Sequence, residues 1–236
     1  WRKLAIFNYE IDPEILQKYL PKGTELDFYN GKCYVSFIGF MFLNVKLLGM
    51  PIPFHRNFEE VNLRFYVKKK EGNIWKRGVV FIKEIVPKYA LSIVANSVYK
   101  ENYATRRMKN NLEISGSELR VTYSWKEHDW YSMEIVAENS ARKMENDSEF
   151  EFITEHYWGF TKKKSRTSEY EVCHPKWDWY PVKNHAVKVD FEKVYGYDFA
   201  SLNHQKPISV MLAEGSEVQV KMKKYLAEKI AEEKSS

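Results

Sequence analysis

Three polar side chains alternate with apolar ones in the segment EEVNLRFYV, and together they have the chemistry to hold a small ligand. Glu60, Asn62 and Arg64 lie at a spacing of two, and the residues between them are apolar. Side chains alternate between the two faces of a strand, so the segment predicts a strand with one apolar and one polar face. The polar face is either a solvated ladder or the wall of a pocket, in which Arg64 would hold a carboxylate or other anion bidentately.

The following predicted strand, 78–86, carries two charges among apolar residues. Strict alternation puts Lys83 and Glu84 on opposite faces. Burying an unpaired charge is costly, so each should either find a partner or reach solvent near the strand end. In the buried case, we expect Glu60 to pair with Lys83 and Arg64 with Glu84. A desolvated lysine can also act as a nucleophile, which makes Lys83 a weak catalytic candidate.

Apolar residues recur at spacings of three and four after Pro87 and predict a helix over residues 88–99. If the helix continues, Asn96, Tyr99 and Tyr103 fall on one of its faces. Two phenols and an amide facing a cavity would orient a small polar ligand. The alternative is that the tyrosines belong to the core with satisfied hydroxyl groups.

Composition and length indicate one β-rich domain. The chain has 236 residues, and its 16 Tyr, 14 Phe and 7 Trp are of the aromatic type that favours strands. No repeat or linker is visible, so we expect a single domain over residues 1–222, followed by a charged tail at 223–236 that frays. Short strands with two or three short helices predict an α+β fold, in which a curved antiparallel sheet or barrel closes on a central cavity.

Turn and capping residues give the boundaries of several elements. Asp12 as N-cap and Pro13 at the first position predict a short helix. Asn30 and Gly31 suit a type I′ turn. A further short helix is expected at 149–157. The predicted strands, besides 60–68 and 78–86, are 33–43, which is apolar enough to be covered on both faces, 112–115, 118–125, 131–137, 170–172, 186–191, 208–212 and 218–222.

Several function classes have no support. The net charge of +5 is concentrated in lysine runs beside predicted turns, which indicates solvated hairpin tips and neither a nucleic-acid nor a membrane surface. The two cysteines have no CxxC spacing, and no two histidines have a metal-binding spacing, so neither a metal nor a cofactor is expected. Without a signal peptide or an apolar run of about 18 residues, the chain is expected to be cytoplasmic.

The whole set of segments resembles the YqjF-like family of uncharacterised conserved bacterial proteins (domain of unknown function 2071), which is grouped with the acetoacetate decarboxylase-like superfamily. The resemblance rests on DPEILQKYLPKGTELDFYNGKCYVSFIGF, NFEEVNLRFYV, GVVFIKEIVPKYALSIVANSVYKENY, HPKWDWYPV and PISVMLAEGSEV. It implies a curved antiparallel sheet around a cavity and a cytoplasmic location. It supplies no activity, because the family is largely uncharacterised.

Acetoacetate decarboxylases use a Schiff-base lysine from a Lys-Lys pair, and the similar region here reads Lys100-Glu101. A second ammonium lowers the pKa of such a nucleophile, whereas Glu101 would raise it. Acetoacetate decarboxylation is therefore not expected. The leading interpretation is a cavity that binds a small organic molecule, an anion among the candidates. The alternatives are a lyase or isomerase that uses Lys83 or Lys100 through an imine, with Glu101 as a further weak candidate, and a scaffold without ligand. A homo-oligomer is left open.

Overall fold

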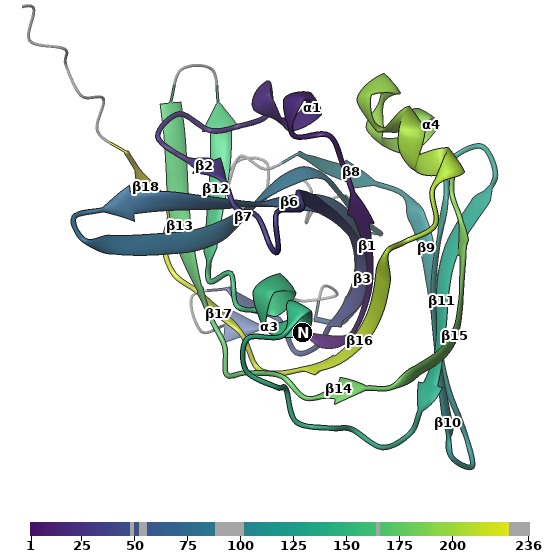
Figure 1. Ribbon diagram of the computed structural model, residues 1–236. Helices are drawn as coiled ribbons and strands as arrows, with labels where there is room; N and C mark the ends of the chain where they lie inside the picture. The colour runs from purple at the N-terminus through teal and green to yellow at the C-terminus, as the bar shows by residue number, and fades with distance from the viewer. Residues whose placement is uncertain (48–49, 52–55, 88–101, 164–165, 227–236) are drawn as a thin grey trace, which may run out of the picture.

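One large curved sheet dominates the structure, a computed structural model that describes residues 1–47, 50–51, 56–87, 102–163 and 166–226. Figure 1 shows the sheet bending around α3. Its strands, in spatial order, are β14 (Trp179–Tyr180), β16 (Ser209–Gly215), β1 (Arg2–Glu10), β3 (Tyr34–Phe42), β6 (Phe58–Glu71), β7 (Ile74–Val86), β12 (Trp158–Lys163), β13 (Arg166–Cys173) and β17 (Gln219–Val220). Three short strands pair beside this path: β2 (Glu25–Leu26), β8 (Tyr103–Thr105) and β18 (Lys224–Tyr225).

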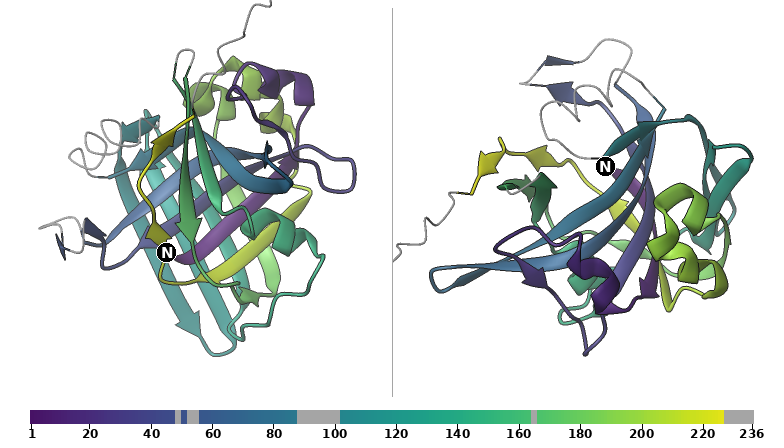
Figure 2. Two further views of the ribbon diagram at one scale, coloured as in Figure 1. Left: turned by 90° about the vertical axis from the view of Figure 1, so that its left-hand side faces the viewer. Right: turned by 90° about the horizontal axis from the view of Figure 1, so that it is seen from above.

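A second sheet packs on the convex side of the first one, as Figures 1 and 2 show. Its strands, in spatial order, are β15 (Val182–Lys188), β11 (Trp130–Glu138), β10 (Glu118–Lys126) and β9 (Arg107–Ser115). A two-stranded ribbon is formed by β4 (Lys46–Leu47) and β5 (Met50–Pro51). The helices of the described residues are α1 (Pro13–Gln17), α3 (Glu149–Thr154), α4 (Phe191–Tyr195) and the 3₁₀ helix η1 (Tyr197–His204).

Each face of the large sheet has its own hydrophobic core. On the convex face, Phe7, Phe37 and Leu63 pack against residues of the second sheet, Trp125 among them. On the concave face, Ile6, Ile38 and Tyr66 pack against Phe152 of α3, among others. Both faces of β3 are therefore covered, as its nearly continuous apolar sequence predicts.

The β-rich fold with few short helices is confirmed, but two details of the expectation differ. The strand order has two ends among the described residues, so closure into a barrel is not confirmed. The sheet is also mixed, because β12 and β8 both run parallel to β7. Parallel neighbours cannot be joined by a tight hairpin turn, and in sequence β7 is separated from β8 and β12 by 16 residues or more.

Local signals predicted the early elements correctly. The Asp12 carboxylate accepts a hydrogen bond from the Glu14 N–H at 2.9 Å and caps α1. Asn30 and Gly31 both have positive φ, as the predicted turn requires. The strand predicted at 186–191 is wrong at its end, because Asp190 caps α4 by accepting from the Lys193 N–H. Strand β1 was not predicted, although it lies in the middle of the sheet.

Among the described residues, no helix has both the length and the apolar character that a membrane-spanning helix requires. The cytoplasmic location stays a prediction.

The contact between the two sheets leaves no space for a side chain at Gly39. A Cβ atom there would lie 2.6 Å from Met133 Sδ and 2.7 Å from Tyr123 Cδ2. We predict that Gly39→Ala lowers the free energy of unfolding by about 1–3 kcal/mol, because it overpacks this core. Denaturant titration measures the effect, with Ser201→Ala at an exposed position as the control. Equal midpoints for Gly39→Ala and wild type would show that the sheets are not in such close contact.

Candidate functional site

A hollow of about 1600 Å³ lies on the concave face of the large sheet. Its walls come from strands β1, β3, β6, β7, β8, β12, β13 and β17, from the end of α3 and from loops next to these elements. Aromatic and aliphatic side chains form much of the lining: Ile38, Phe40, Phe42, Phe58, Val79, Phe81, Val86, Tyr170, Val172 and Trp177. Ionisable groups are set among them, which is the usual composition of a small-molecule site.

Strand β6 brings three of the predicted site residues to this hollow. Glu60, Asn62 and Arg64 all line it, whereas Val61 and Leu63 point into the convex core. Glu60 and Asn62 are each only 2% exposed, so their face of the strand is not a solvated ladder. The alternation of polar and apolar residues along β6 therefore positions a carboxylate, an amide and a guanidinium along one wall of the hollow.

A β-bulge in β7 places Glu84 beside Asn62. Leu63 pairs with Lys83, but Arg64 pairs with Phe81, so one extra residue of β7 is accommodated at Ile82. Before the bulge, Phe81 faces the hollow; after it, Glu84 does. Strict alternation along the strand, which the sequence alone suggests, would have put these two side chains on opposite faces.

Two of the carboxylates that line the hollow, Glu60 and Glu84, each accept a hydrogen bond from a neighbouring residue of the same wall. Asn62 Nδ2 donates to Glu60 Oε1 at 2.9 Å, and Asn62 and Glu84 are directly opposite each other across the two strands. Tyr103 lies opposite Glu84 in β8 and donates its hydroxyl proton to it. Burial, together with the charges of Glu60 and Glu84, raises the pKa of Tyr103 well above its ordinary value. Tyr103 therefore remains a hydrogen-bond donor at neutral pH.

Arg64 is the cation of this wall. Its Nη2 donates to the Ile153 carbonyl of α3 at 3.0 Å, and its guanidinium lies 5.6 Å from the centre of the Tyr66 ring. The described residues supply no other hydrogen-bond acceptor to the guanidinium, and its Nε is buried without one. A guanidinium has five N–H donors, so Arg64 retains donors for a ligand in the hollow.

Two histidines line the hollow as well. His156 is buried, with Nδ1 at 2.6 Å from the Phe152 carbonyl and Nε2 at 3.1 Å from Asp27 Oδ2. Asp27 also accepts a hydrogen bond from Arg77 Nε at 2.7 Å. Burial lowers the pKa of His156 to about 4, against the opposing effect of Asp27. The ring is therefore neutral at pH 7 and donates to one of its two acceptors.

His174 lies beside Trp177 on the lining of the hollow. Its ring stacks on Trp177 with 4.1 Å between the centroids, and its Nδ1–H donates to the Pro175 carbonyl at 2.9 Å. Burial lowers the pKa of His174 to about 4, and the positive charge of Arg64 contributes to the shift. The neutral ring leaves Nε2 as an acceptor on the lining.

The structure does not bring Lys83 to the hollow. The bulge turns its side chain to the convex side, where Nζ donates to the Val194 carbonyl near the Tyr195 ring. Burial lowers the pKa of Lys83. The expected pairing of Lys83 with Glu60 is therefore wrong. The expected bond between Arg64 and Glu84 is not found for Arg64 either, because its guanidinium donates to the Ile153 carbonyl of α3 instead.

Of the residues predicted on a helical face, Tyr103 alone can be placed. It belongs to strand β8 and reaches the hollow beside Glu84. The expectation that it shares a helix face is therefore wrong, because the chain is already extended at this position. Asn96, Tyr99, Lys100 and Glu101 lie outside the described residues.

Sequence reasoning assigned neither histidine nor the aromatic wall to the site. His156 has no partner at a recognisable spacing, because Asp27 reaches it through the fold, whereas His174 stacks on Trp177, only three residues further along the chain. The wall residues of β3 had a usable signal: Ile38, Phe40 and Phe42 alternate in the same way as the polar residues of β6.

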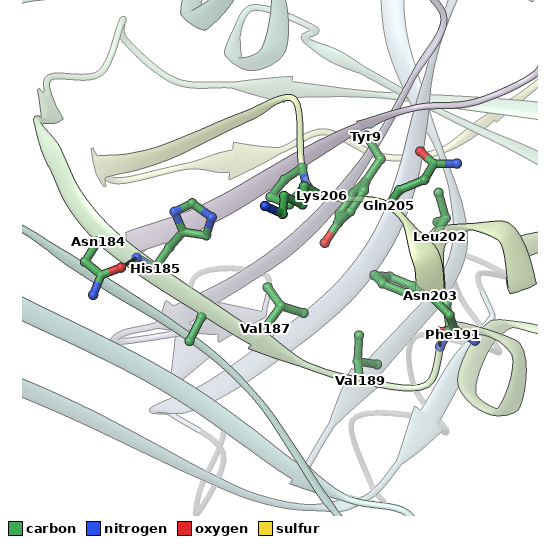
Figure 3. A pocket seen from close by; sticks show the side chains of 12 residues that line it. Tyr9, Asn184, His185, Val187, Val189, Phe191, Leu202, Asn203, Gln205 and Lys206 are labelled. Atoms are coloured by element: carbon green, nitrogen blue, oxygen red, sulfur yellow. Dashed lines mark hydrogen bonds between the residues drawn. The ribbon is translucent and has the colours of Figure 1, made fainter.

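A second, smaller hollow of about 480 Å³ lies between β15 and the segment after η1 (Figure 3). Tyr9, His185 and Lys206 are among its lining residues. Burial raises the pKa of Tyr9 to about 12, so its hydroxyl stays protonated. Asn203 stabilises the start of α4, because its Oδ1 accepts a hydrogen bond from the Phe191 N–H at 2.7 Å. Glu60, Glu84 and Arg64 all line the larger hollow and not this one.

The described residues contain no cluster of three or more His, Cys, Asp or Glu side chains placed to hold a metal ion. Cys33 and Cys173 are both free thiols.

Comparison with known proteins identifies the family. The profile of DUF2071, described as an uncharacterized conserved protein (COG2071), matches residues 1–217. The chain belongs to the DUF2071 family. A curated relative, the uncharacterized protein YqjF of Bacillus subtilis (strain 168), is 37% identical over 82 residues, which make up 34% of this chain and 32% of that protein. The match thus spans about a third of that relative.

Solved structures with the same fold include acetoacetate decarboxylase, an acetoacetate decarboxylase-like enzyme and a biosynthetic enzyme. One from Sphingomonas wittichii RW1 has a TM-score of 0.63 at 11% identity and covers 95% of this chain and 90% of its own. Acetoacetate decarboxylase from Legionella pneumophila has a TM-score of 0.59 at 14% identity, with 96% and 85% covered. The enduracididine biosynthesis enzyme MppR, complexed with pyruvate, has a TM-score of 0.58 at 11% identity, with 92% and 87% covered. At these identities the likeness concerns the fold.

The neutral state of His174 predicts a pH dependence of stability. Its ordinary pKa of 6.5 falls to about 4 in the folded protein, so the unfolded state binds more protons between these values. The stability that depends on neutral His174 is complete above about pH 6.5 and is lost as the pH falls towards 4. We predict a smaller loss of melting temperature on acidification for His174→Phe, which preserves the stacking on Trp177.

Thermal melts between pH 7 and pH 4 measure this effect. His204→Gln, at an exposed position, is the control and should keep the wild-type dependence. If the melting temperature of His174→Phe fell with pH as steeply as that of the wild type, the lowered pKa of His174 would be contradicted.

Proposed function

We propose that the hollow on the concave face binds a small organic molecule that carries a carboxylate. The observation that carries the proposal is the position of Arg64, whose guanidinium borders the hollow with a single protein acceptor, the Ile153 carbonyl, among the described residues. A guanidinium matches the planar geometry of a carboxylate and can bind it through two parallel hydrogen bonds.

The anchoring of Arg64 supports a binding role. The hydrogen bond to the Ile153 carbonyl and the adjacent Tyr66 ring fix the guanidinium before a ligand arrives. A pre-positioned group loses less conformational entropy on binding. The free acceptor on neutral His174 lies on the lining too, and it would accept from a hydroxyl or amino group of the ligand.

The part of the wall that carries Glu60 and Glu84 favours a ligand with a second polar group, different from its carboxylate. Glu60 and Glu84 repel a carboxylate, so the acidic end of the ligand is expected at Arg64 and not beside these two residues. Asn62 Oδ1 is buried without a donor among the described residues and would accept a hydrogen bond from the other end. The apolar walls suit the carbon skeleton between the two ends.

The fold neighbours suggest which acids to try first. One of the MppR structures holds pyruvate in its complex, so short 2-oxo acids are the natural first probes.

An imine-forming lyase or isomerase is a separate activity. Lys83 does not line the hollow, and Lys46 is the lysine on its lining in the described part of the chain. Borohydride treatment in the presence of a 2-oxo acid, read by intact mass, separates an imine-forming enzyme from a binder.

We predict that Arg64→Gln weakens the binding of short 2-oxo acids by at least about tenfold, which corresponds to about 1.4 kcal/mol. The physical reason is the loss of a charge-assisted hydrogen-bond pair. Isothermal titration with pyruvate and longer 2-oxo acids measures the change.

Two further variants serve as controls. Glu60→Gln removes a negative charge from the same wall and should keep or strengthen acid binding. Arg120→Gln removes an exposed guanidinium that pairs with Glu134 on the second sheet, and it should leave binding unchanged. Equal affinity of wild type and Arg64→Gln would overturn the proposed orientation of the ligand.

A further inference from the structure

Strand β9 forms an exposed edge of the second sheet. Among the described residues it pairs with β10 alone, and all of its residues except Met108 are exposed. Two of these are apolar, since Leu112 is 46% and Ile114 is 60% exposed. An edge strand of nine residues with free backbone groups is a template for another strand, and proteins usually shield such an edge.

The side chains of β9 divide cleanly between its two faces. Leu112 lies opposite Val121 and Ile114 opposite Leu119, so both point to the apolar side of the sheet. The outer face carries Lys109, Asn111 and Glu113 in succession. Near the start of the strand, Asn110 donates to Glu59 of β6 at 3.2 Å. Towards the end of the strand, the side chains of Leu112 and Ile114 are exposed.

The hairpin loop determines which backbone groups point outwards. Ser115 pairs with Glu118 across a loop of two residues, and the pair that flanks such a loop is hydrogen bonded. Residues 113, 111 and 109 therefore direct their N–H and C=O groups to β10. Residues 114, 112, 110 and 108 direct theirs to the free edge.

We propose that a second copy of the chain docks on this edge, with the two β9 strands antiparallel about a two-fold axis at Asn111. In this register Lys109 of each copy lies opposite Glu113 of the other, so two opposite-charge pairs form. Met108 likewise lies opposite Ile114, twice. The register also matches the outward backbone groups, because residue 110 meets 112 and residue 108 meets 114.

Registers shifted by one pairing step form different charge pairs. One puts Asn111 opposite Glu113 and forms no charge pair. The other puts Lys109 opposite Asn111 and pairs Arg107 with Glu113, so neither pairs Lys109 with Glu113. In a two-fold interface, one and the same patch must be complementary to itself. Strand β9 meets this condition, because Lys109 and Glu113 lie at equal distances on either side of Asn111. The result is one continuous sheet through both copies, in which Ile114 of each copy lies beside Met108 of the other.

Charge reversal tests the interface. Light scattering coupled to size exclusion should give about twice the 28.1 kDa of one chain for the wild type. Lys109→Glu and Glu113→Lys should each reduce the mass to that of one chain, because like charges then face each other twice. The double variant Lys109→Glu/Glu113→Lys restores both pairs and should be dimeric again.

Controls separate this interface from other arrangements. Lys126→Glu reverses an exposed charge at the far end of the neighbouring strand and should leave the mass unchanged. Circular dichroism confirms that the single variants fold. A monomeric wild type at its highest soluble concentration, or dimers in both single variants, would overturn the proposal. Monomers in the double variant would overturn the register, and with it the pairing of two β9 strands.

Discussion

The bulge at Ile82 determines which charges reach the hollow. Without the bulge, side chains would alternate strictly between the two faces along the whole of β7. Lys83 would then lie on the concave side and Glu84 in the convex core. A single extra residue exchanges the two. Glu84 then joins Asn62 and Tyr103, and the Lys83 ammonium reaches the Val194 carbonyl on the other side of the sheet. Because a misplaced buried charge costs several kcal/mol, the bulge and the polar residues around it depend on each other.

The large sheet needs apolar cover on both faces, and this need limits where polar groups can lie. The convex face is covered by the second sheet together with α4 and η1, and at Gly39 the two sheets lie so close that no side chain fits there. The concave face is covered only in part, by α3 and the residues near Trp177. The remaining space is the hollow, and the polar positions of β6 face it. Charge is tolerated there because Asn62, Tyr103 and the Ile153 carbonyl supply hydrogen-bond partners.

Sequence reasoning succeeded where a single element carries the information and failed where two must be aligned. The polar face of β6 and the cap of α1 follow from the local period and from one residue type. The bulge depends on how β7 pairs with β6, which no spacing in 78–86 reveals. Tyr103 was placed on a helix because its aromatic spacing fits one, whereas pairing beside β7 holds it in a strand. The contact of His156 with Asp27 is tertiary, so no local pattern indicates it, whereas Trp177 follows His174 by only three residues.

These features support one account, in which the concave wall binds an organic acid through Arg64 while the carboxylates of β6 and β7 orient its other end. The most direct measurement is a crystal structure of the protein grown with a saturating short 2-oxo acid. The account predicts the ligand carboxylate within hydrogen-bond distance of the Arg64 guanidinium, with its carbon chain along the aromatic wall of β3. A ligand bound instead in the smaller hollow beside Tyr9, or with its carboxylate turned away from Arg64, would contradict it.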